Sequence, residues 1–404
     1  MSQSGGTALK LVAKTFYGLE TVLAKELAAL GAQEITTLKR AVSFEADMAL
    51  LYKSNLHLRT AIRILMPIAT FNATSDIELY KKIKEMDWSK YLRADQTLAV
   101  DAITYSKIFT HSKYVSLKTK DAICDRFRDE TGQRPSVDIE SPTVLINIHI
   151  AEDQVTVSLD SSAEPLNRRG YRTNEHEAPI NEVLAAGMVL LSEWDTKSTF
   201  IDPMCGSGTI VMEAAMIAAN IAPNIKRKDF GFTRWNNFDA PLWEKIRHEA
   251  IEAQTTPTAR ICGSDISLRA IDTARQSALD FGLKQFIDFS CAPLEEVNPI
   301  SKKGVVIMNP PYGERLKTRD IVQMYIGIGN HLKRNFQGFD AWVISSNLEA
   351  MKLIGLKPSA KITLYNGALE CRFEKFSLYE GSHADMVRKR RIIPRDDSAP
   401  RQKI

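Results

Sequence analysis

The sequence is poor in cysteine. Five cysteines are scattered over 404 residues without a C-x-x-C pair, and the seven histidines do not join them at zinc-ligand spacing. Disulfide frameworks and structural zinc sites both depend on clustered ligands of this kind. We therefore expect neither disulfides nor a bound metal.

Long apolar runs are also missing, because no stretch approaches the ~20 apolar residues that cross a bilayer. The first ten residues, MSQSGGTALK, lack the basic start and the apolar core of a secretory signal peptide. These absences predict a cytoplasmic protein with no membrane partner.

Neither sign of charge is in large excess. The chain has 53 Lys and Arg against 49 Asp and Glu, a net charge of +4, and a pI of about 8.6. This mildly basic balance permits nucleic-acid binding without requiring it. The length suggests two or three domains rather than one.

The front of the chain contains alternating short strands and helices. The spacing of apolar residues predicts two small α+β units. The elements of the first unit are Leu9–Ala13, Gly18–Leu30, Ala41–Phe44, Asp47–Ser54 and Thr60–Phe71. Those of the second are Asp76–Lys84, Thr97–Thr104, Lys113–Arg128, Val144–Ile150 and Gln154–Asp160. On the helix that begins at Lys113, we expect Val115, Leu117 and Ile123 to face inward.

The composition changes after residue 160. Residues 161–177 are polar and basic, which indicates a boundary, and an apolar helix is predicted at Ile180–Leu191. Strands and helices then alternate, as in a parallel doubly wound sheet. The strands expected there are Thr199–Ile201, Arg260–Gly263, Gly304–Met308 and Ala341–Ser345. Asn366-Gly367 between two alternating apolar runs predicts a final antiparallel hairpin, which classical dinucleotide dehydrogenases lack.

A glycine-rich loop follows the first of these strands, at Asp202 to Thr209. Gly206 and Gly208 allow a sharp turn and a close approach of the backbone to a ligand. No lysine follows Gly208, so the loop is not a P-loop. The acidic Asp202 argues against a diphosphate and suits a ligand that carries an ammonium group. A purely structural turn remains the alternative.

Asp265, at the end of the next strand, is a second candidate. A carboxylate there can accept hydrogen bonds from both ribose hydroxyls of a nucleoside. It can also cap the helix that is expected to begin at Ser267. Because Asp265 occurs together with the glycine-rich loop, a ligand-binding role is favoured over a capping role, and Ile266 would then contact the ligand as well.

Asn309-Pro310-Pro311-Tyr312 follows the strand Gly304–Met308. The Asn309 side-chain oxygen and the Pro310 carbonyl can both accept hydrogen bonds from an exocyclic amino group. Pro310 and Pro311 stiffen the loop by fixing φ, and the Tyr312 ring can stack on a flat base. Ligands of open parallel sheets bind at this end of the strands.

Basic residues gather in two further places. The first is the helix Lys113–Arg128, with Lys113, Lys118 and Lys120, which can bind phosphate or can simply form a solvated face. The second is the connector, where Tyr171 is interleaved among Arg168, Arg169 and Arg172. Phosphate contact is expected there.

Several of these strings together resemble a known family. They are Leu159-Asp160-Ser161-Ser162, Leu166–Arg172, Ala178–Glu182, Asp202–Thr209, the aromatic insertion with Phe230, Phe232, Trp235 and Trp243, and Asn309–Leu316. From about residue 8 to 380 the chain resembles the THUMP-domain RNA methyltransferases, and within them the bacterial 23S rRNA guanine-N2 methyltransferase group.

The resemblance implies a Rossmann-like class I methyltransferase domain whose mostly parallel sheet ends in an antiparallel hairpin. It implies a ferredoxin-like region at 8–59, a THUMP RNA-binding domain at 60–162, the methyltransferase domain at 163–382, and a basic tail at 383–404. S-adenosyl-L-methionine would be bound by Asp202, Pro203, Cys205, Gly206, Ser207, Gly208, Thr209, Asp265 and Ile266. Asn309, Pro310, Pro311 and Tyr312 would be catalytic.

One position departs from the pattern. Many class I methyltransferases have an acidic residue after the third strand that contacts adenine. Here the strand Phe286–Ser290 leads into Cys291-Ala292-Pro293, and the first acid is Glu295. Backbone atoms are expected to serve instead.

The implied reaction is methylation of guanosine N2 in 23S rRNA. A tRNA guanine-N2 methyltransferase would use the same modules. An enzyme acting on DNA adenine or on a protein glutamine would not need the basic front units. A non-catalytic RNA-binding protein would not need an intact Asn309 and Tyr312.

Overall fold

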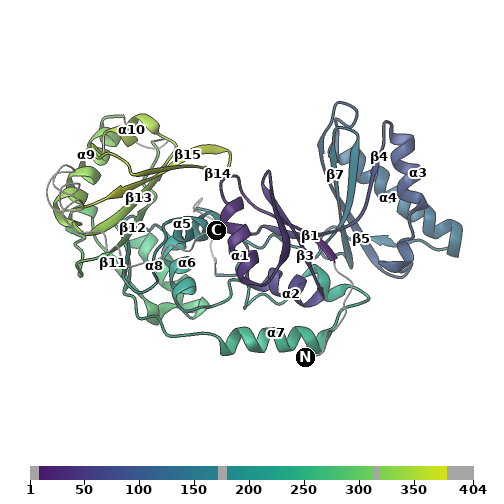
Figure 1. Cartoon of the computed structure of the whole chain (residues 1–404), viewed down its shortest axis with the longest axis horizontal. Helices are drawn as coiled ribbons and strands as arrows, with labels where there is room; N and C mark the ends of the chain where they lie inside the picture. The colour runs from purple at the N-terminus through teal and green to yellow at the C-terminus, as the bar shows by residue number, and fades with distance from the viewer. Residues whose placement is uncertain (1–8, 172–179, 314–317, 380–404) are drawn as a thin grey trace, which may run out of the picture.

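A computed structural model describes residues 9–171, 180–313 and 318–379. The chain forms two β-sheets with helices packed against them (Figure 1). The expected segments at 178–179, 314–316 and 383–404, and Arg172, lie outside the described residues.

The first sheet has eight strands in the order β2-β3-β1-β4-β8-β7-β5-β6. Its strands are β1 (Leu9–Lys14), β2 (Gln33–Leu38), β3 (Ala41–Ala46), β4 (Arg63–Asn72), β5 (Thr97–Tyr105), β6 (Ser136–Val137), β7 (Val144–Ala151) and β8 (Gln154–Asp160). Its helices are α1 (Glu20–Ala29), α2 (Met48–His57), α3 (Asp76–Glu85) and α4 (Ser112–Thr131). Strand β4 pairs with β1 on one side and with β8 on the other. The two front units therefore share one continuous sheet.

The second sheet has seven strands in the order β11-β10-β9-β12-β13-β15-β14. Its strands are β9 (Thr199–Asp202), β10 (Ile261–Asp265), β11 (Ile287–Cys291), β12 (Gly304–Met308), β13 (Phe339–Ser345), β14 (Ala360–Asn366) and β15 (Leu369–Ser377). The first five in the sheet are parallel. Strand β15 is antiparallel to β13, and the last strand, β14, is antiparallel to β15 within the terminal hairpin. The prediction of a mostly parallel sheet with a terminal hairpin is confirmed.

The helices of this half are α5 (Glu182–Leu191), α6 (Thr209–Ala218), α7 (Ala240–Glu252), α8 (Leu268–Phe281), α9 (Thr318–Asn335) and α10 (Leu348–Lys352). Their ends follow local sequence signals. Asn181, Ser267 and Asn347 accept hydrogen bonds at the starts of α5, α8 and α10. Gly282 ends α8 in a left-handed conformation.

The insertion between α6 and β10 does not belong to the core of the second sheet. Its aromatic residues lie in the same buried cluster as the core of the front units. The ring of Tyr52 on α2 stacks on Phe232 at 4.4 Å and meets Trp243 of α7 edge-on. Figure 1 shows α7 reaching below α2, away from the second sheet.

Three details of the sequence prediction differ from the structure. Strands β2 and β6 were not expected, because their sequences are polar and every residue but the half-buried Ile35 is exposed. On α4, Leu117 was expected to face inward but is 51% exposed. The buried side of that helix is formed by Val115, Thr119 and Ile123 among others, and Leu117 lies off that face.

Candidate active site

The glycine-rich loop and the Asn309 loop follow neighbouring strands. Strand β9 pairs with β10 on one side and with β12 on the other. The chain order of the strands reverses at β9, so the boundary between β9 and β12 is the switch point of the sheet. Ligands of open α/β sheets bind in the crevice outside the carboxyl ends of the strands at such a point.

The glycine-rich loop is fixed by bonds to the end of β10. The Cys205 N–H donates to the Ser264 carbonyl at 2.9 Å, and the Gly206 N–H donates to Oδ2 of Asp265 at 2.9 Å. Gly208 has φ +83°, and a Cβ there would lie 3.0 Å from that of Ala274. A side chain at this position would therefore push the loop away from α8.

Helix α6 begins directly after this loop. Gly208 is its N-cap, so Thr209 is the first helical residue, and it is buried. Pro203 and Cys205 are also buried beneath the loop, whereas Ser207 is half-buried. The helix N-terminus thus faces the crevice with Ser207 at its edge. Burial and the carboxylates of Asp202 and Asp265 raise the pKa of the Cys205 thiol, so Cys205 remains a neutral packing residue.

Asp202 is completely buried at the end of β9. Its Oδ1 accepts the Met204 N–H at 3.1 Å, while Oδ2 has no partner among the described residues. Burial, with the negative charge of Asp265 nearby, raises the pKa of this carboxyl to about 8. A buried acceptor without a partner is costly. A ligand ammonium group would supply the missing partner.

Asp265 links the glycine-rich loop to the loop that follows β10. Its Oδ1 accepts the Ser267 N–H at 2.9 Å, in addition to the Oδ2 bond to Gly206. The N-cap of α8 is Ser267 and not Asp265. The neighbouring Ile266 is 76% exposed, which gives the crevice an apolar wall. These residues fit a nucleoside that carries an ammonium group, as S-adenosylmethionine does.

The loop after β11 is the position at which the sequence lacks the acidic residue that contacts adenine in many class I methyltransferases. The Ala292 N–H donates to the Asp265 carbonyl at 3.0 Å. Glu295 does not replace the missing acid in this loop, because its carboxylate lies beside Gly327 of α9. The part of the loop nearest Asp265 therefore presents backbone groups and the exposed Cys291.

Asn309, Pro310, Pro311 and Tyr312 form the loop after β12. The Tyr312 hydroxyl donates to Oδ1 of Asn309 at 2.7 Å and accepts from Nδ2 of Asn366 at 3.3 Å. Burial raises the pKa of Tyr312, so its hydroxyl stays protonated. The side-chain oxygen expected to hold an amino group is thus bonded to Tyr312 in this structure.

Residues that the sequence analysis did not select hold this loop in place. Tyr325 of α9 donates to the Pro311 carbonyl at 3.4 Å and is 2.7 Å from Oγ of Ser345. Asn347 donates to the Tyr312 carbonyl at 3.1 Å. Ser345 and Asn347 stand at the carboxyl end of the next strand, β13. Their position at a strand end was the sequence signal that could have identified them, because polar residues at the carboxyl ends of neighbouring parallel strands lie along one edge of the sheet.

Arg169 was expected to contact RNA, and the structure contradicts this. The residue is 1% exposed. Its guanidinium donates to the carbonyls of Leu166 and Arg59 and lies 3.4 Å from the Glu213 carboxylate. Arg169 thus ties the connector to α6 and to the front of the chain, and cannot reach a phosphate.

The other expected RNA-binding residues are accessible to different degrees. Arg168 is exposed and pairs with Glu164 at 2.8 Å. On α4, Lys113 is exposed, Lys118 lies 3.8 Å from Asp76, and Lys120 pairs with Asp121. These surface pairs leave the lysines free to exchange partners, because such pairs contribute only about 0–1 kcal/mol.

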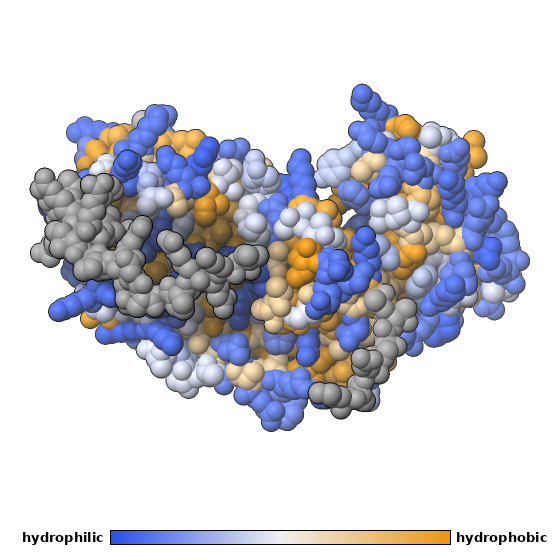
Figure 2. Space-filling model, in the orientation of Figure 1, coloured by the Kyte–Doolittle hydropathy of each residue, from blue (hydrophilic) through white to orange (hydrophobic). Residues whose placement is uncertain are grey.

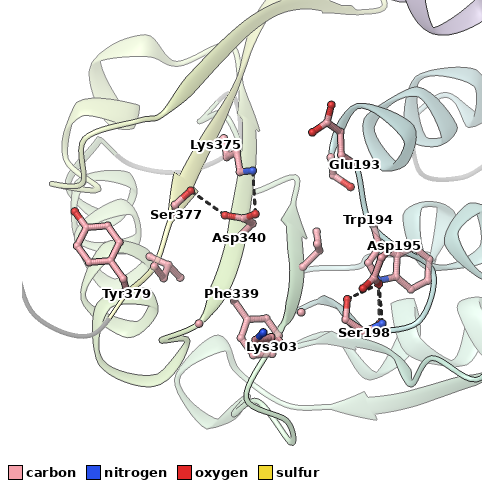
Figure 3. A pocket seen from close by; sticks show the side chains of 15 residues that line it. Glu193, Trp194, Asp195, Ser198, Lys303, Phe339, Asp340, Lys375, Ser377 and Tyr379 are labelled. Atoms are coloured by element: carbon pink, nitrogen blue, oxygen red, sulfur yellow. Dashed lines mark hydrogen bonds and ion pairs between the residues drawn. The ribbon is translucent and has the colours of Figure 1, made fainter. Parts of the chain in front are cut away.

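A cavity of about 540 Å³ lies at the opposite edge of the second sheet (Figure 3). It is lined by Gly304 and Phe339, at the amino ends of β12 and β13. Asp340 inside it is held by Lys375 at 2.9 Å and by Ser377 at 2.8 Å. Asp340 is thus paired within the cavity, which lies at the opposite ends of the strands from the glycine-rich loop and the Asn309 loop.

Within residues 9–171, 180–313 and 318–379, no three His, Cys, Asp or Glu side chains are placed to hold a metal ion. The helices described there include none with the length and apolar character that a membrane span requires.

Comparisons with known proteins agree with this geometry. The model of the RMKL-like methyltransferase domain matches residues 169–375, that of the THUMP domain matches 73–160, and that of the RlmL ferredoxin-like domain matches 10–65. A protein of Synechocystis sp. named "Putative RNA methyltransferase" is 37% identical over 364 residues, which are 90% of this chain and 95% of that protein.

"Ribosomal RNA large subunit methyltransferase K/L" of Syntrophotalea carbinolica is 38% identical over 384 residues. These are 92% of this chain but 54% of that protein, so the chain spans about half the length of this curated relative. A crystal structure of "a putative methyltransferase complexed with SAH" has 30% identity and a TM-score of 0.84, and the match covers 93% of this chain and 99% of that one. The chain therefore belongs to the RMKL-like methyltransferase family, with THUMP and ferredoxin-like domains in front of its catalytic domain.

Proposed function

We propose that the chain transfers a methyl group from S-adenosylmethionine to the exocyclic N2 of a guanosine in 23S rRNA. The observation that carries the proposal is the pairing of β9 with β12, which brings the glycine-rich loop and the Asn309 loop to one crevice. The name of the Syntrophotalea relative favours large-subunit rRNA as the substrate, and that of the Synechocystis relative favours RNA. The choice of guanine N2 rests on the sequence resemblance.

The residues of the glycine-rich loop would hold the cofactor, which supplies an electrophilic methyl group when bound. Asp202 would accept a hydrogen bond from the ligand ammonium through Oδ2, which lacks a partner in the described structure. Each carboxylate oxygen of Asp265 accepts one protein N–H and retains a further lone pair for a ribose hydroxyl. Ile266 would cover one side of the nucleoside.

The Asn309 loop would hold the target base. Oδ1 of Asn309 and the Pro310 carbonyl would accept the two amino hydrogens and so fix the direction of the nitrogen lone pair. The Tyr312 hydroxyl occupies one of the two lone pairs of Oδ1 and competes with the substrate there, and its ring would stack on the base. The base must be unpaired or extruded to enter, because its amino group is otherwise engaged in pairing.

The front units would hold the surrounding RNA mainly through phosphates and shape. We keep Lys113, Lys118, Lys120 and Arg168 as candidates for phosphate contact, and residues 60–162 as the RNA-binding domain. An enzyme that modifies ribosomal RNA would act in the cytoplasm.

The test is transfer of labelled methyl from S-adenosylmethionine to total cellular RNA, which is then separated into rRNA and tRNA. Label is expected in the 23S fraction, and nucleoside digestion should recover it as N2-methylguanosine. Label confined to tRNA would refute the rRNA assignment. Label in adenosine, DNA or protein would refute the target class.

Two variants test the site itself. Asn309→Ala removes one of the two proposed acceptors and should lower kcat by about 100-fold or more, in the range found for removal of one catalytic hydrogen-bonding group. Asp265→Ala should weaken binding of S-adenosylhomocysteine in calorimetry, while Asn309→Ala should not. Full activity of Asn309→Ala would contradict the catalytic assignment.

A further inference from the structure

Two cations stand close together where the second sheet meets the front of the chain. Lys14 is the last residue of β1 and pairs with Ala41 of β3, and the neighbouring Thr15 N–H donates to the carbonyl of Arg40, which lies just before β3, at 3.0 Å. Burial, followed by the positive charge of Arg40, lowers the pKa of Lys14. Among the described residues, neither Lys14 nor Arg40 has a carboxylate within ion-pair distance. Two like charges that lack an ion-pair partner favour the binding of an anion, because the nearby Glu20 carboxylate accepts backbone N–H groups and not these side chains.

Aromatic rings flank these cations. The Arg40 guanidinium lies 5.6 Å from the centre of the Tyr365 ring, and Tyr17 meets the same ring edge-on at 5.6 Å. Arg40 is exposed and Tyr17 is 42% exposed. Bases of single-stranded RNA stack on tyrosine rings and on guanidinium planes of this kind.

Local structure fixes this cluster. Gly18 has φ +88°, and a Cβ there would lie 2.5 Å from the Thr363 carbonyl of β14. Only glycine allows this approach, which brings Tyr17 to Tyr365. The two oxygens of Glu20 accept the backbone N–H groups of Gly18 and Arg40 at 2.7 and 3.0 Å. The cluster is therefore held in place before any ligand binds.

The same residues connect the catalytic loop to the first sheet. Asn366, next to Tyr365, donates to the Tyr312 hydroxyl. On the other side, the pKa of His149 on β7 is lowered by burial and then by Lys14. The His149 ring is 5.9 Å from that of Tyr105 on β5, which is 64% exposed. Figure 2 shows the molecule hollowed along its upper edge between the two lobes that carry these sheets.

This surface differs from that of the lysines on α4. By strand alternation, His149 and Tyr105 lie on the face of β7 and β5 opposite to Ile146, Ile148 and Leu98. Those three residues share a core with the buried side of α4. Lys14 alternates with Leu11 and Ala13, which belong to the same core, so Lys14, His149 and Tyr105 share the face of the sheet that α4 does not cover.

We propose that Lys14, Arg40, Tyr17 and Tyr365 bind the single-stranded RNA that leads into the catalytic loop, with His149 and Tyr105 continuing the path. This rests on the proposed function only in taking RNA as the substrate. Lys14 and Arg40 contact phosphates, and Tyr17 and Arg40 offer stacking surfaces. Glu370, which accepts from the Tyr365 hydroxyl at 3.1 Å, orients that ring.

The test is the affinity of the full chain for a fluorescent single-stranded 20-nucleotide RNA, measured by anisotropy over a range of salt. Lys14→Gln and Arg40→Gln should each weaken binding about fivefold at 0.1 M salt. Each should lower the slope of log K against log salt by about 0.7, the value for one phosphate contact. The matched control is Lys81→Gln on α3, an exposed lysine 4.0 Å from Glu85, which should bind as the unchanged protein does.

Tyrosine variants separate stacking from structure. Tyr17→Ala should weaken binding about fivefold or more, since one stacked base contributes about 1–3 kcal/mol, whereas Tyr17→Phe should restore it. Arg40→Gln should not lower the melting temperature, because it removes repulsion from Lys14. Binding of S-adenosylhomocysteine should be unchanged in all of these variants.

Wild-type RNA affinity in both Lys14→Gln and Arg40→Gln would overturn the proposal. Equal affinity of the protein for the same RNA sequence in a duplex would also overturn the proposal. Absence of methyl transfer to any RNA by the unchanged protein would refute the proposed function alone, because the RNA path is judged by binding.

Discussion

The Tyr312 hydroxyl donates to Oδ1 of Asn309, the oxygen that would hold the substrate amino group. The roles of the hydroxyl and of the ring can therefore be tested separately. Tyr312→Phe keeps the ring but frees Oδ1 of Asn309, so kcat/KM should be equal to or up to about fivefold above that of the unchanged protein, for a hydrogen bond of about 1 kcal/mol. Tyr312→Ala loses the stacking surface and should reduce kcat/KM about 5- to 150-fold. Labelled methyl transfer to total RNA measures both.

The control is the affinity for S-adenosylhomocysteine, which neither change should alter. Equal loss of activity in Tyr312→Phe and Tyr312→Ala would mean that the hydroxyl itself is required.

The buried carboxyl of Asp202 gives a second prediction for a single residue. Its pKa of about 8 means that it is mostly protonated in the free protein at pH 6.5, whereas pairing with a ligand ammonium requires the ionised form. Binding of S-adenosylhomocysteine should therefore release close to one proton at pH 6.5 and almost none at pH 9. The affinity should rise with pH up to about 8. Calorimetry in buffers of different ionisation enthalpy measures the release.

Asp202→Asn should abolish this proton release, since an amide does not titrate. If the release persists in Asp202→Asn, another group is responsible and the assignment of the ammonium partner is wrong.

At the scale of elements, helix α9 contacts the Asn309 loop through Tyr325, and the position of the helix depends on a close contact. A Cβ at Gly329 would lie 1.9 Å from the Ile354 carbonyl oxygen. Gly329→Ala must therefore push α9 away and should cost about 3 kcal/mol, the upper part of the range for overpacking. Methyl transfer should fall as well, because Tyr325 moves with the helix.

Gly327→Ala, two residues earlier on the same helix, is the matched control. Its nearest neighbour would be a Glu295 oxygen at 3.8 Å, so the better helix propensity of alanine should stabilise by up to about 1 kcal/mol. Denaturant unfolding measures both variants. A stable Gly329→Ala protein would show that α9 can shift without loss.

Only the part of the candidate site that lies at strand ends could be predicted from the sequence. Asp202, Asp265 and Asn309 each follow a buried apolar strand, so their shared edge could be predicted. Tyr325 and Asn366 could not, because one lies within an amphipathic helix and the other beside a turn glycine. Their contact with the Asn309 loop depends on how α9 and the hairpin pack.

At the scale of the whole molecule, the two halves are joined by buried charge. Arg169 of the connector lies between the Arg59 carbonyl and the Glu213 carboxylate, without solvent. Removing one partner of a buried pair costs about 3–5 kcal/mol. Arg169→Met should therefore lower the free energy of unfolding by that amount.

The adjacent Arg168 provides the control, because it is exposed and pairs with Glu164 on the surface. Arg168→Met should change stability by less than about 1 kcal/mol. Chemical unfolding of the two variants compares them directly. Similar stabilities would show that the buried pair contributes little to joining the halves.

The sequence by itself determined most of the elements, the parallel sheet with its hairpin and the three loops at the strand ends, but not the exposed strands β2 and β6. Apolar periodicity and turn residues are local properties, and parallel strands place their carboxyl ends together. Only the tertiary structure decided which polar residues are buried and which charges lack partners. It made Arg169 a core residue, placed the insertion around Trp243 in the front core, and brought Lys14 to Arg40. Burial and charge pairing depend on contacts between segments far apart in the chain, and no local pattern records them.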